Sequence, residues 1–210
     1  MSVDVLALAR AERADLADLL ATLTPGQWEA PSLCAGWRVR DVVAHMLSYE
    51  ELDGRGLLRR LARGRFTPGR INAVGLAENA GRDPEELRAL LARHLTPRGL
   101  TAAFGGRIGL VDGLIHHQDI RRPLGLPREV PGERLRQALP FALYAPVIRG
   151  ALRARGLRLV AMDLDWAHGR GPEVRGKAEA LLLAIAGRAS VVGELAGEGQ
   201  AELERRSRTW

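Results

Sequence analysis

The sequence predicts a mainly α protein, in which a four-helix bundle is followed by a smaller C-terminal α+β extension that contains a β-hairpin. Residues 1–127 hold several stretches with apolar residues at helical spacing, separated by segments rich in proline and glycine. Residues 128–210 show a different pattern: a helical stretch is followed by a segment in which apolar and polar residues alternate as in a strand. We therefore expect a bundle over 1–127 and, packed on it, a helix, a hairpin and further helices over 128–210.

The first two predicted helices are separated by a loop. The first helix covers about residues 3–23, where leucines fall on one helical face. Residues 27–36 are predicted to form a connecting loop, because they combine proline, serine and glycine. The second helix is expected to begin near Val39 and to continue to about Leu61. Residues 64–81 show little periodicity, which indicates a long loop or a broken helix.

The last two helices of the predicted bundle have clearer boundary signals. Asp83 and Pro84 predict the start of the third helix, since aspartate caps a helix N-terminus and proline fits the first helical position. The fourth helix is expected to begin at Thr101 or Gly106 and to end near Arg121. Four helices with their apolar faces turned inward, joined by loops of mixed length, favour a four-helix bundle.

The C-terminal part is predicted to begin with a helix over residues 133–149, bent at its two prolines. Residues 157–166 alternate in the manner of a strand. We expect this strand to turn at residues 168–171 and to pair with a short strand at residues 173–175. Two further helical stretches are predicted, at residues 178–185 and 195–203.

Composition narrows the class of protein. Hydrophobic residues make up 46% of the chain and charged residues 27%, as in ordinary globular proteins. No apolar run approaches the about 20 residues that span a membrane, and residues 1–16 carry charges where a signal peptide is apolar. We therefore expect a cytoplasmic protein with no membrane partner. Cys34 is the only cysteine, which excludes an internal disulfide and a multi-cysteine zinc motif.

The net charge of +6 raises the question of a nucleic-acid partner. The basic residues are spread along the chain and interleaved with acids, which favours an arginine-biased composition over a phosphate-binding surface. A solvated helix end explains the densest group more simply than a surface that guides an anionic substrate. This group consists of Arg59, Arg60, Arg63, Arg65 and Arg70. Nucleic acid is therefore not the expected partner.

A set of polar residues on the predicted helices could hold a metal ion. Asp112, His116 and Asp119 share one helical face, because they are spaced i, i+4 and i+7. His45 lies within an apolar run of the second helix, where a polar ring needs a partner. Helical bundles build metal sites from acids and histidines on facing helices, and three such ligands leave one tetrahedral position open. Spacing alone leaves a simpler interpretation open, with a hydrogen-bonded core histidine and an acid–histidine pair at the surface.

Two motifs resemble those of a known family. Residues 31–45 read PSLCAGWRVRDVVAH and resemble the N-terminal signature of the mycothiol-dependent maleylpyruvate isomerase family, a branch of the DinB-like metalloproteins. Residues 112–125 read DGLIHHQDIRRPLG and look like the second motif of that family. Residues 163–199 are similar to its short-chain actinobacterial members. The resemblance thus covers most of the chain.

This resemblance implies a DinB-like four-helix bundle that holds a divalent metal through His45, Asp112 and His116. Zinc is the first expectation, although nickel, iron or manganese accept similar ligands. The characterised isomerase has glutamate where this sequence has Asp112, which is one methylene shorter. The family uses mycothiol, and a metal with an open position lowers the pKa of a bound thiol. The resemblance thus implies an enzyme that activates a mycothiol-like thiol for transfer to, or isomerisation of, an electrophilic small molecule.

Other residues are candidates for supporting roles. Asp119 can orient His116 or cap Arg122. Arg122 can hold a substrate carboxylate, although the helix dipole explains a cation at this position equally well. For Trp37, an anchor of the loop or core is favoured over a substrate contact. For Cys34, a small packed residue is favoured over a catalytic nucleophile. Two alternatives remain open: a non-catalytic metal-binding or small-molecule-binding regulatory bundle, and a nucleic-acid-associated module.

Overall fold

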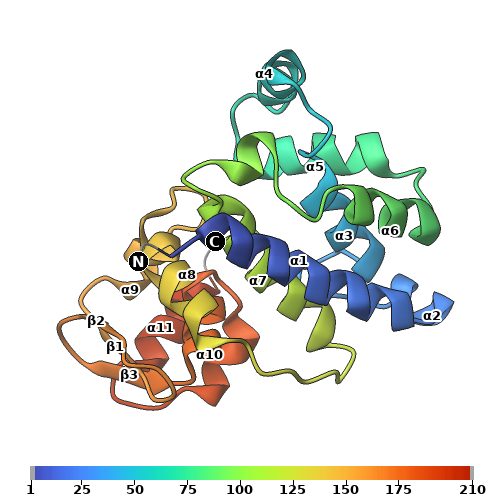
Figure 1. Cartoon of the computed structure of the whole chain (residues 1–210). Helices are drawn as coiled ribbons and strands as arrows, with labels where there is room; N and C mark the ends of the chain where they lie inside the picture. The colour runs from blue at the N-terminus through green and yellow to red at the C-terminus, as the bar shows by residue number, and fades with distance from the viewer. Residues whose placement is uncertain (1–2, 209–210) are drawn as a thin grey trace. The chain divides into compact units, whose positions relative to one another are not determined.

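The structure is a computed structural model that describes residues 3–208 (Figure 1). The chain divides into two compact units, Met1–Pro127 and Arg128–Trp210. Helices dominate both units, and the second unit also holds a small three-stranded sheet. The predicted fold class, mainly α with a C-terminal α+β part, is confirmed. Among residues 3–208, no helix combines the length and the apolar character that a membrane crossing requires.

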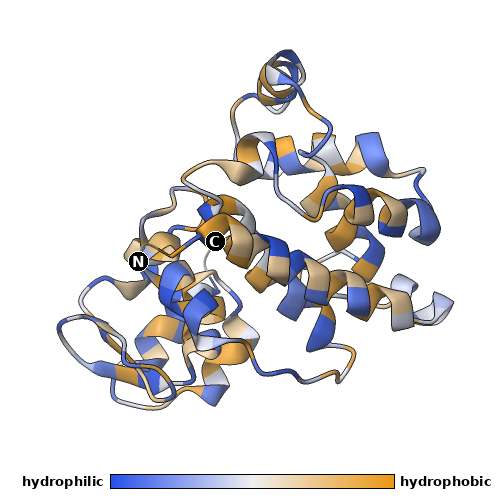
Figure 2. Cartoon of the chain, viewed as in Figure 1, coloured by the Kyte–Doolittle hydropathy of each residue, from blue (hydrophilic) through white to orange (hydrophobic). Residues whose placement is uncertain are grey.

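Four helices of the first unit form a bundle. They are α1 (Val5–Thr22), α3 (Val39–Leu47), α6 (Pro84–Arg93) and α7 (Arg107–Arg121). Both α1 and α3 pack against α6 and against α7, which closes the ring of four helices. Leucine and valine side chains of α1, α3 and α6 supply most of the buried core, together with Trp28 and Ile120. Figure 2 shows the corresponding alternation of apolar and hydrophilic residues along these helices.

Glycines allow α1 and α7 to approach closely. Gly106, just before α7, has a φ of 90°, and a Cβ atom there would lie 2.8 Å from the Cα atom of Leu6. A Cβ atom at Gly113 would lie 3.0 Å from the Cγ atom of Glu12. These close approaches fix the backbone of α7 against α1, and the polar residues on another face of α7 then meet α3.

The predicted loop over residues 27–36 begins instead with the end of a short helix, α2 (Pro25–Glu29). Thr24 and Gln27 cap its N-terminus reciprocally. The Thr24 hydroxyl accepts from the backbone N of Gln27 at 3.3 Å, and the Gln27 side chain accepts from the backbone N of Thr24 at 2.9 Å. The start of the predicted loop was therefore wrong, because this capping box makes a helix of a segment that proline and glycine had marked as irregular.

The predicted second helix, from Val39 to Leu61, was also wrong in its length. The first of two separate helices, α3, ends at Leu47, and α4 (Gly54–Arg63) begins after Asp53. The Asp53 side chain accepts from the backbone N of Gly56 at 2.6 Å and so caps a new helix. Residues 64–81 contain a further helix, α5 (Pro68–Asn79), which agrees with the broken-helix alternative.

The start of α6 is the boundary that the sequence predicted best. The Asp83 side chain accepts from the backbone N of Glu86, and the Glu86 side chain accepts from the backbone N of Asp83, both at 2.8 Å. Pro84 is the first residue of the helix, as predicted. Before α7, the short 3-10 helix η1 (Gly99–Ala102) occupies the alternative start at Thr101.

The second unit is built around α10 (Ala178–Ile185), in which every residue except Glu179 is buried. This helix packs against the other helices of the unit and against two strands of the sheet. The other elements are α8 (Gly132–Tyr144), α9 (Gly150–Ala154), β1 (Arg158–Ala161), β2 (Ala167–Gly169), β3 (Glu173–Gly176), η2 (Ala189–Glu194) and α11 (Gln200–Ser207). The helix predicted over 133–149 thus ends at Tyr144, and a helix predicted from residue 195 begins only at Gln200.

The sheet has the strand order β2-β1-β3, and its pairing differs from the predicted hairpin. The β1 strand pairs antiparallel with β2, where Leu159 lies opposite His168, and parallel with β3, where Leu159 lies opposite Val174. The turn lies earlier than predicted, because the backbone N of Ala161 donates to the carbonyl of Trp166 at 2.9 Å. The hairpin therefore consists of β1 and β2, and the predicted antiparallel partner is a parallel strand.

Candidate metal centre

Helices α3 and α7 bring His45, Asp112 and His116 together. One potential ligand atom from each side chain lies within 4.8 Å of the other two. The Oδ1 atom of Asp112 lies 3.5 Å from Nε2 of His116 and 3.9 Å from Nε2 of His45. The two imidazole rings stand nearly perpendicular, with centroids 5.0 Å apart. The three residues that the sequence suggested thus form one cluster between two helices of the bundle.

Burial differs among the three side chains. Those of His45 and His116 expose 9% and 12% of their surface, whereas that of Asp112 exposes 27%. His45 belongs to the last turn of α3, whose other residues there are buried and apolar. The two histidines therefore lie mostly within the protein core, whereas the carboxylate of Asp112 is partly accessible to solvent.

The separations fit a small divalent cation. A tetrahedral zinc ion with nitrogen and oxygen ligands at about 2.0–2.2 Å holds neighbouring ligand atoms about 3.3–3.6 Å apart. The distance from Asp112 Oδ1 to His116 Nε2, 3.5 Å, lies in that range, and the distance to His45 Nε2 exceeds it by a few tenths of an ångström. Two imidazole nitrogens and one carboxylate are also a common donor set of catalytic zinc sites.

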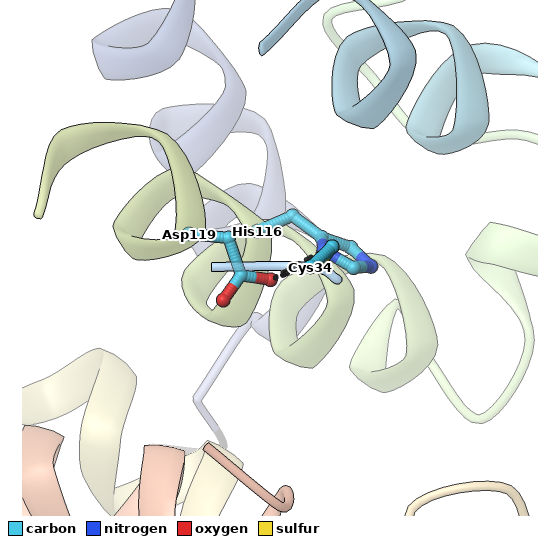
Figure 3. Close-up of side chains that lie close together, drawn as sticks. All are labelled: Cys34, His116 and Asp119. Atoms are coloured by element: carbon cyan, nitrogen blue, oxygen red, sulfur yellow. Dashed lines mark hydrogen bonds and ion pairs between the residues drawn. The ribbon is translucent and has the colours of Figure 1, made fainter. Parts of the chain in front are cut away.

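The second ring nitrogen of His116 faces a different group of side chains (Figure 3). The Nδ1 atom of His116 lies 2.8 Å from Oδ2 of Asp119, whose side chain has no exposed surface. The thiol of Cys34 donates to the same Oδ2 atom at 3.1 Å and lies 3.8 Å from Nδ1 of His116. Because an ionised carboxylate only accepts, Nδ1 of His116 carries a proton, and its Nε2 atom is the one directed at Asp112.

Cys34, His116 and Asp119 also satisfy the distance criterion for three potential metal ligands. Two of their three separations, 2.8 and 3.1 Å, are hydrogen-bond distances and are shorter than the about 3.3–3.6 Å between ligands of a tetrahedral ion. We therefore interpret this group as a hydrogen-bonded cluster that supports His116. The preferred sequence interpretation of Cys34, a small packed residue, is incomplete, because its thiol also donates to Asp119.

Electrostatics keep a proton on His116 when no metal is bound. Burial alone would lower the pKa of His116, but the charge of Asp112 and the hydrogen bonds to Asp119 and Cys34 outweigh it and raise the pKa to about 10. The metal-free imidazole is thus a cation between two carboxylates. A divalent cation on the Nε2 side would replace this proton and supply the positive charge that the carboxylates favour.

Two aromatic residues stand beside His45. The ring of Trp37 is tilted against that of His45, with centroids 5.1 Å apart, and the ring of Tyr49 meets it edge-on at 6.3 Å. The Tyr49 hydroxyl donates to Asn72 Oδ1 at 3.3 Å, and burial raises the pKa of this phenol. Tyr49 was not among the residues predicted from the sequence, although its spacing of four residues from His45 could have indicated it.

Arg122 and His117, near the end of α7, are not members of the cluster of His45, Asp112 and His116. Arg122 is the C-cap residue of α7, six positions after His116, and is partly buried. His117 has no exposed surface, and its Nδ1 atom lies 2.8 Å from Oε1 of Glu12 on α1. The Nε2 atom of His117 accepts from Nε of Arg121 at 2.9 Å. His117 therefore belongs to the contact between α1 and α7 rather than to the candidate metal centre.

The fold and the site define a helical-bundle protein with a largely buried His–Asp–His cluster. Residues 9–121 match the family described as the mycothiol maleylpyruvate isomerase N-terminal domain, and the chain belongs to this family. This membership confirms the resemblance inferred from the two motifs.

Two solved structures share the fold. The crystal structure of the mycothiol-dependent maleylpyruvate isomerase matches with a TM-score of 0.56 and 15% identity, covering 93% of this chain and 92% of that chain. A histidine-to-alanine variant of such an isomerase matches with a TM-score of 0.57 and 13% identity over the same shares. No curated protein matches the chain in sequence. At these identities, the two structures establish the fold and leave the substrate open.

Proposed function

We propose that this protein is a divalent-metal-dependent enzyme that activates a low-molecular-weight thiol and directs it to an electrophilic small molecule, by transfer or by isomerisation. The observation that carries the proposal is the convergence of His45, Asp112 and His116 between α3 and α7. Membership of the mycothiol maleylpyruvate isomerase family supports the use of a mycothiol-like thiol. The solved relative is named for maleylpyruvate, an electrophile of the expected class.

In this proposal His45, Asp112 and His116 hold the metal within the unit Met1–Pro127, with zinc as the first candidate. A divalent metal with an open coordination position lowers the pKa of a thiol that binds to it. Asp112 reaches one methylene less far than the glutamate expected from the resemblance, and its partly exposed side is the proposed direction from which a thiol enters. Asp119 accepts from Nδ1 of His116 and so leaves Nε2 as the atom that would bind the metal once its proton is displaced.

We propose two further residues, one beside His45 and one at the end of α7, as contacts of the small molecules. Trp37 and Tyr49 flank His45, and Trp37 is the proposed aromatic contact of a substrate, because the ring of Tyr49 lies under Arg60 and its hydroxyl donates to Asn72. Arg122, at the end of α7, is the proposed partner of a substrate carboxylate, because a guanidinium binds a carboxylate through two parallel hydrogen bonds. These roles would decide which electrophile is accepted.

An activity assay with mycothiol and maleylpyruvate tests the proposal directly. We expect turnover only when both metal and thiol are present, and we expect His45→Ala and His116→Ala to lower it at least about a hundredfold. His168→Ala, a histidine in β2 of the other unit, is the matched control and should keep full turnover. Turnover that is independent of the thiol would overturn the proposal. Stoichiometric metal without thiol binding would instead favour the non-catalytic alternative, a regulatory bundle.

A further inference from the structure

We propose that Cys34 is a positioning residue for the metal centre, because its thiol fixes the carboxylate of Asp119 and, through it, the imidazole of His116. The inference rests on the proposed metal site and adds a residue to which that proposal gives no role. Two donors, the Cys34 S–H at 3.1 Å and the His116 Nδ1–H at 2.8 Å, meet on the same oxygen of Asp119 (Figure 3). Removing the thiol would leave this buried carboxylate with one donor fewer to fix its orientation.

The loop before α3 places the thiol accurately. The backbone N of Leu33 donates to the carbonyl of Asp119 at 3.0 Å, so the loop is bound to the residue that its cysteine also contacts. The Ser32 hydroxyl accepts from the backbone N of Cys34 at 3.1 Å and donates to the carbonyl of Trp37 at 2.9 Å. The backbone N of Trp37 donates back to the carbonyl of Cys34 at 2.9 Å. These bonds fix the backbone of Cys34 beside Asp119, so the approach of its thiol to the carboxylate does not depend on side-chain packing alone.

A buried carboxylate with both donors in place keeps the Nε2 atom of His116 directed at the metal position. Residues that orient a ligand in this way typically change metal affinity by about 10–100-fold when they are removed. We expect Cys34→Ala to weaken cobalt binding by about 10–100-fold and to alter the visible spectrum of the cobalt-loaded protein, because the imidazole is less constrained.

Two further substitutions separate hydrogen bonding from packing. Cys34→Ser keeps a donor on a shorter side chain, whereas Cys34→Val fills the space of the thiol without any donor. The proposal predicts that serine restores part of the affinity lost in Cys34→Ala and that valine restores none. The free energy of unfolding, measured on the metal-free variants, shows how much of each change is structural. Restoration by valine and not by serine would overturn the proposal, because packing would then be the role of Cys34.

The single cysteine also allows a reversible test on the unmutated chain. Methyl methanethiosulfonate converts the Cys34 thiol to a methyl disulfide and releases methanesulfinic acid, which removes the S–H donor. Dithiothreitol then reduces this disulfide and returns the thiol. We expect cobalt affinity to fall after modification and to recover after reduction. Unchanged affinity in the fully modified protein would contradict the proposal.

These outcomes are distinguishable from those of the proposed function. Cobalt binding that depends on Cys34, in a protein without thiol-dependent turnover, supports this inference and overturns the proposed reaction. Cobalt binding that is insensitive to every change at Cys34, in a protein with thiol-dependent turnover, overturns this inference and supports the proposed reaction. A protein that binds no cobalt in any preparation overturns both.

Discussion

The Nδ1 atom of His116 lies 2.8 Å from Oδ2 of Asp119, a carboxylate with no exposed surface. We expect Asp119→Asn to lower metal affinity by about 10–100-fold, since an amide accepts the Nδ1–H less strongly and no longer fixes the ring. Competition with a coloured chelator measures the dissociation constant. Asp163→Asn is the matched control, because this carboxylate accepts from the backbone N of Ala178 in the other unit, and it should leave the dissociation constant unchanged. Equal affinities for Asp119→Asn and the unmutated protein would show that this contact does not orient a ligand.

Metal affinity should rise with pH. Burial opposes the proton on His116, but Asp112, Asp119 and Cys34 outweigh it and raise its pKa to about 10, so the metal must displace a proton at neutral pH. We expect affinity to increase about tenfold per pH unit between about pH 7 and 9. In the metal-free protein, the same raised pKa contributes stability that is fully present below pH 6.5 and is lost as the pH rises through about 10. A flat affinity profile, corrected for the chelator, would mean that Nε2 binds no metal.

The buried pair of Arg13 and Glu50 is expected to be essential for the stability of the bundle. Glu50 accepts from Arg13 Nη2 at 2.6 Å, from the Thr101 hydroxyl at 2.6 Å and from the backbone N of Arg98 at 3.1 Å. Glu50→Gln leaves a buried guanidinium without its counter-charge, which typically costs about 3–5 kcal/mol of unfolding free energy. Urea denaturation measures this cost. Glu204→Gln breaks the solvent-exposed pair with Arg208 and should cost less than about 1 kcal/mol. Equal costs at Glu50 and Glu204 would show that burial does not make the Arg13–Glu50 pair more important.

The close contact of α1 and α7 makes a prediction for Gly106. Alanine there would adopt an unfavourable φ of 90° and place its Cβ atom 2.8 Å from the Cα atom of Leu6. We expect Gly106→Ala to lower the free energy of unfolding by about 2–4 kcal/mol, from backbone strain and overpacking together. Gly125→Ala also has a positive φ but meets no atom within 4 Å, so its cost should be about 1 kcal/mol. Similar losses at both glycines would mean that the interhelical contact adds nothing.

Local signals explain which helices could be predicted. The start of α6 follows from Asp83, Pro84 and Glu86, whose preferences act within one turn and need no tertiary context. The break between α3 and α4 also has a local signal, because residues 48–56 are mostly polar and hold the cap Asp53 and two glycines, and the prediction of one continuous helix overlooked it. In the sheet, the alternation of apolar and polar residues indicates a strand but does not show with which neighbour the strand pairs. The parallel pairing of β1 and β3 could therefore not be predicted from the sequence.

In the candidate site, too, some residues could be predicted from local spacing and others could not. The i, i+4 spacing of Asp112 and His116 places them on one helical face, and their resemblance to a family motif selects them from other polar pairs. The hydrogen bond from Cys34 to Asp119 joins residues 85 positions apart. It depends on how a loop folds over α7, which no local pattern encodes. The contact on which the proposed role of Cys34 rests is therefore visible only in the fold.

Metal content, measured by elemental analysis of the purified protein, tests the central claim most directly. The account predicts about one divalent ion per chain in the unmutated protein and in Asp112→Glu, because glutamate supplies the same carboxylate on a longer arm. It predicts loss of that ion in His45→Ala and His116→Ala, and retention in the control His168→Ala. A metal content that is unchanged in His45→Ala and His116→Ala, or that is zero in every preparation of the unmutated protein, would contradict it.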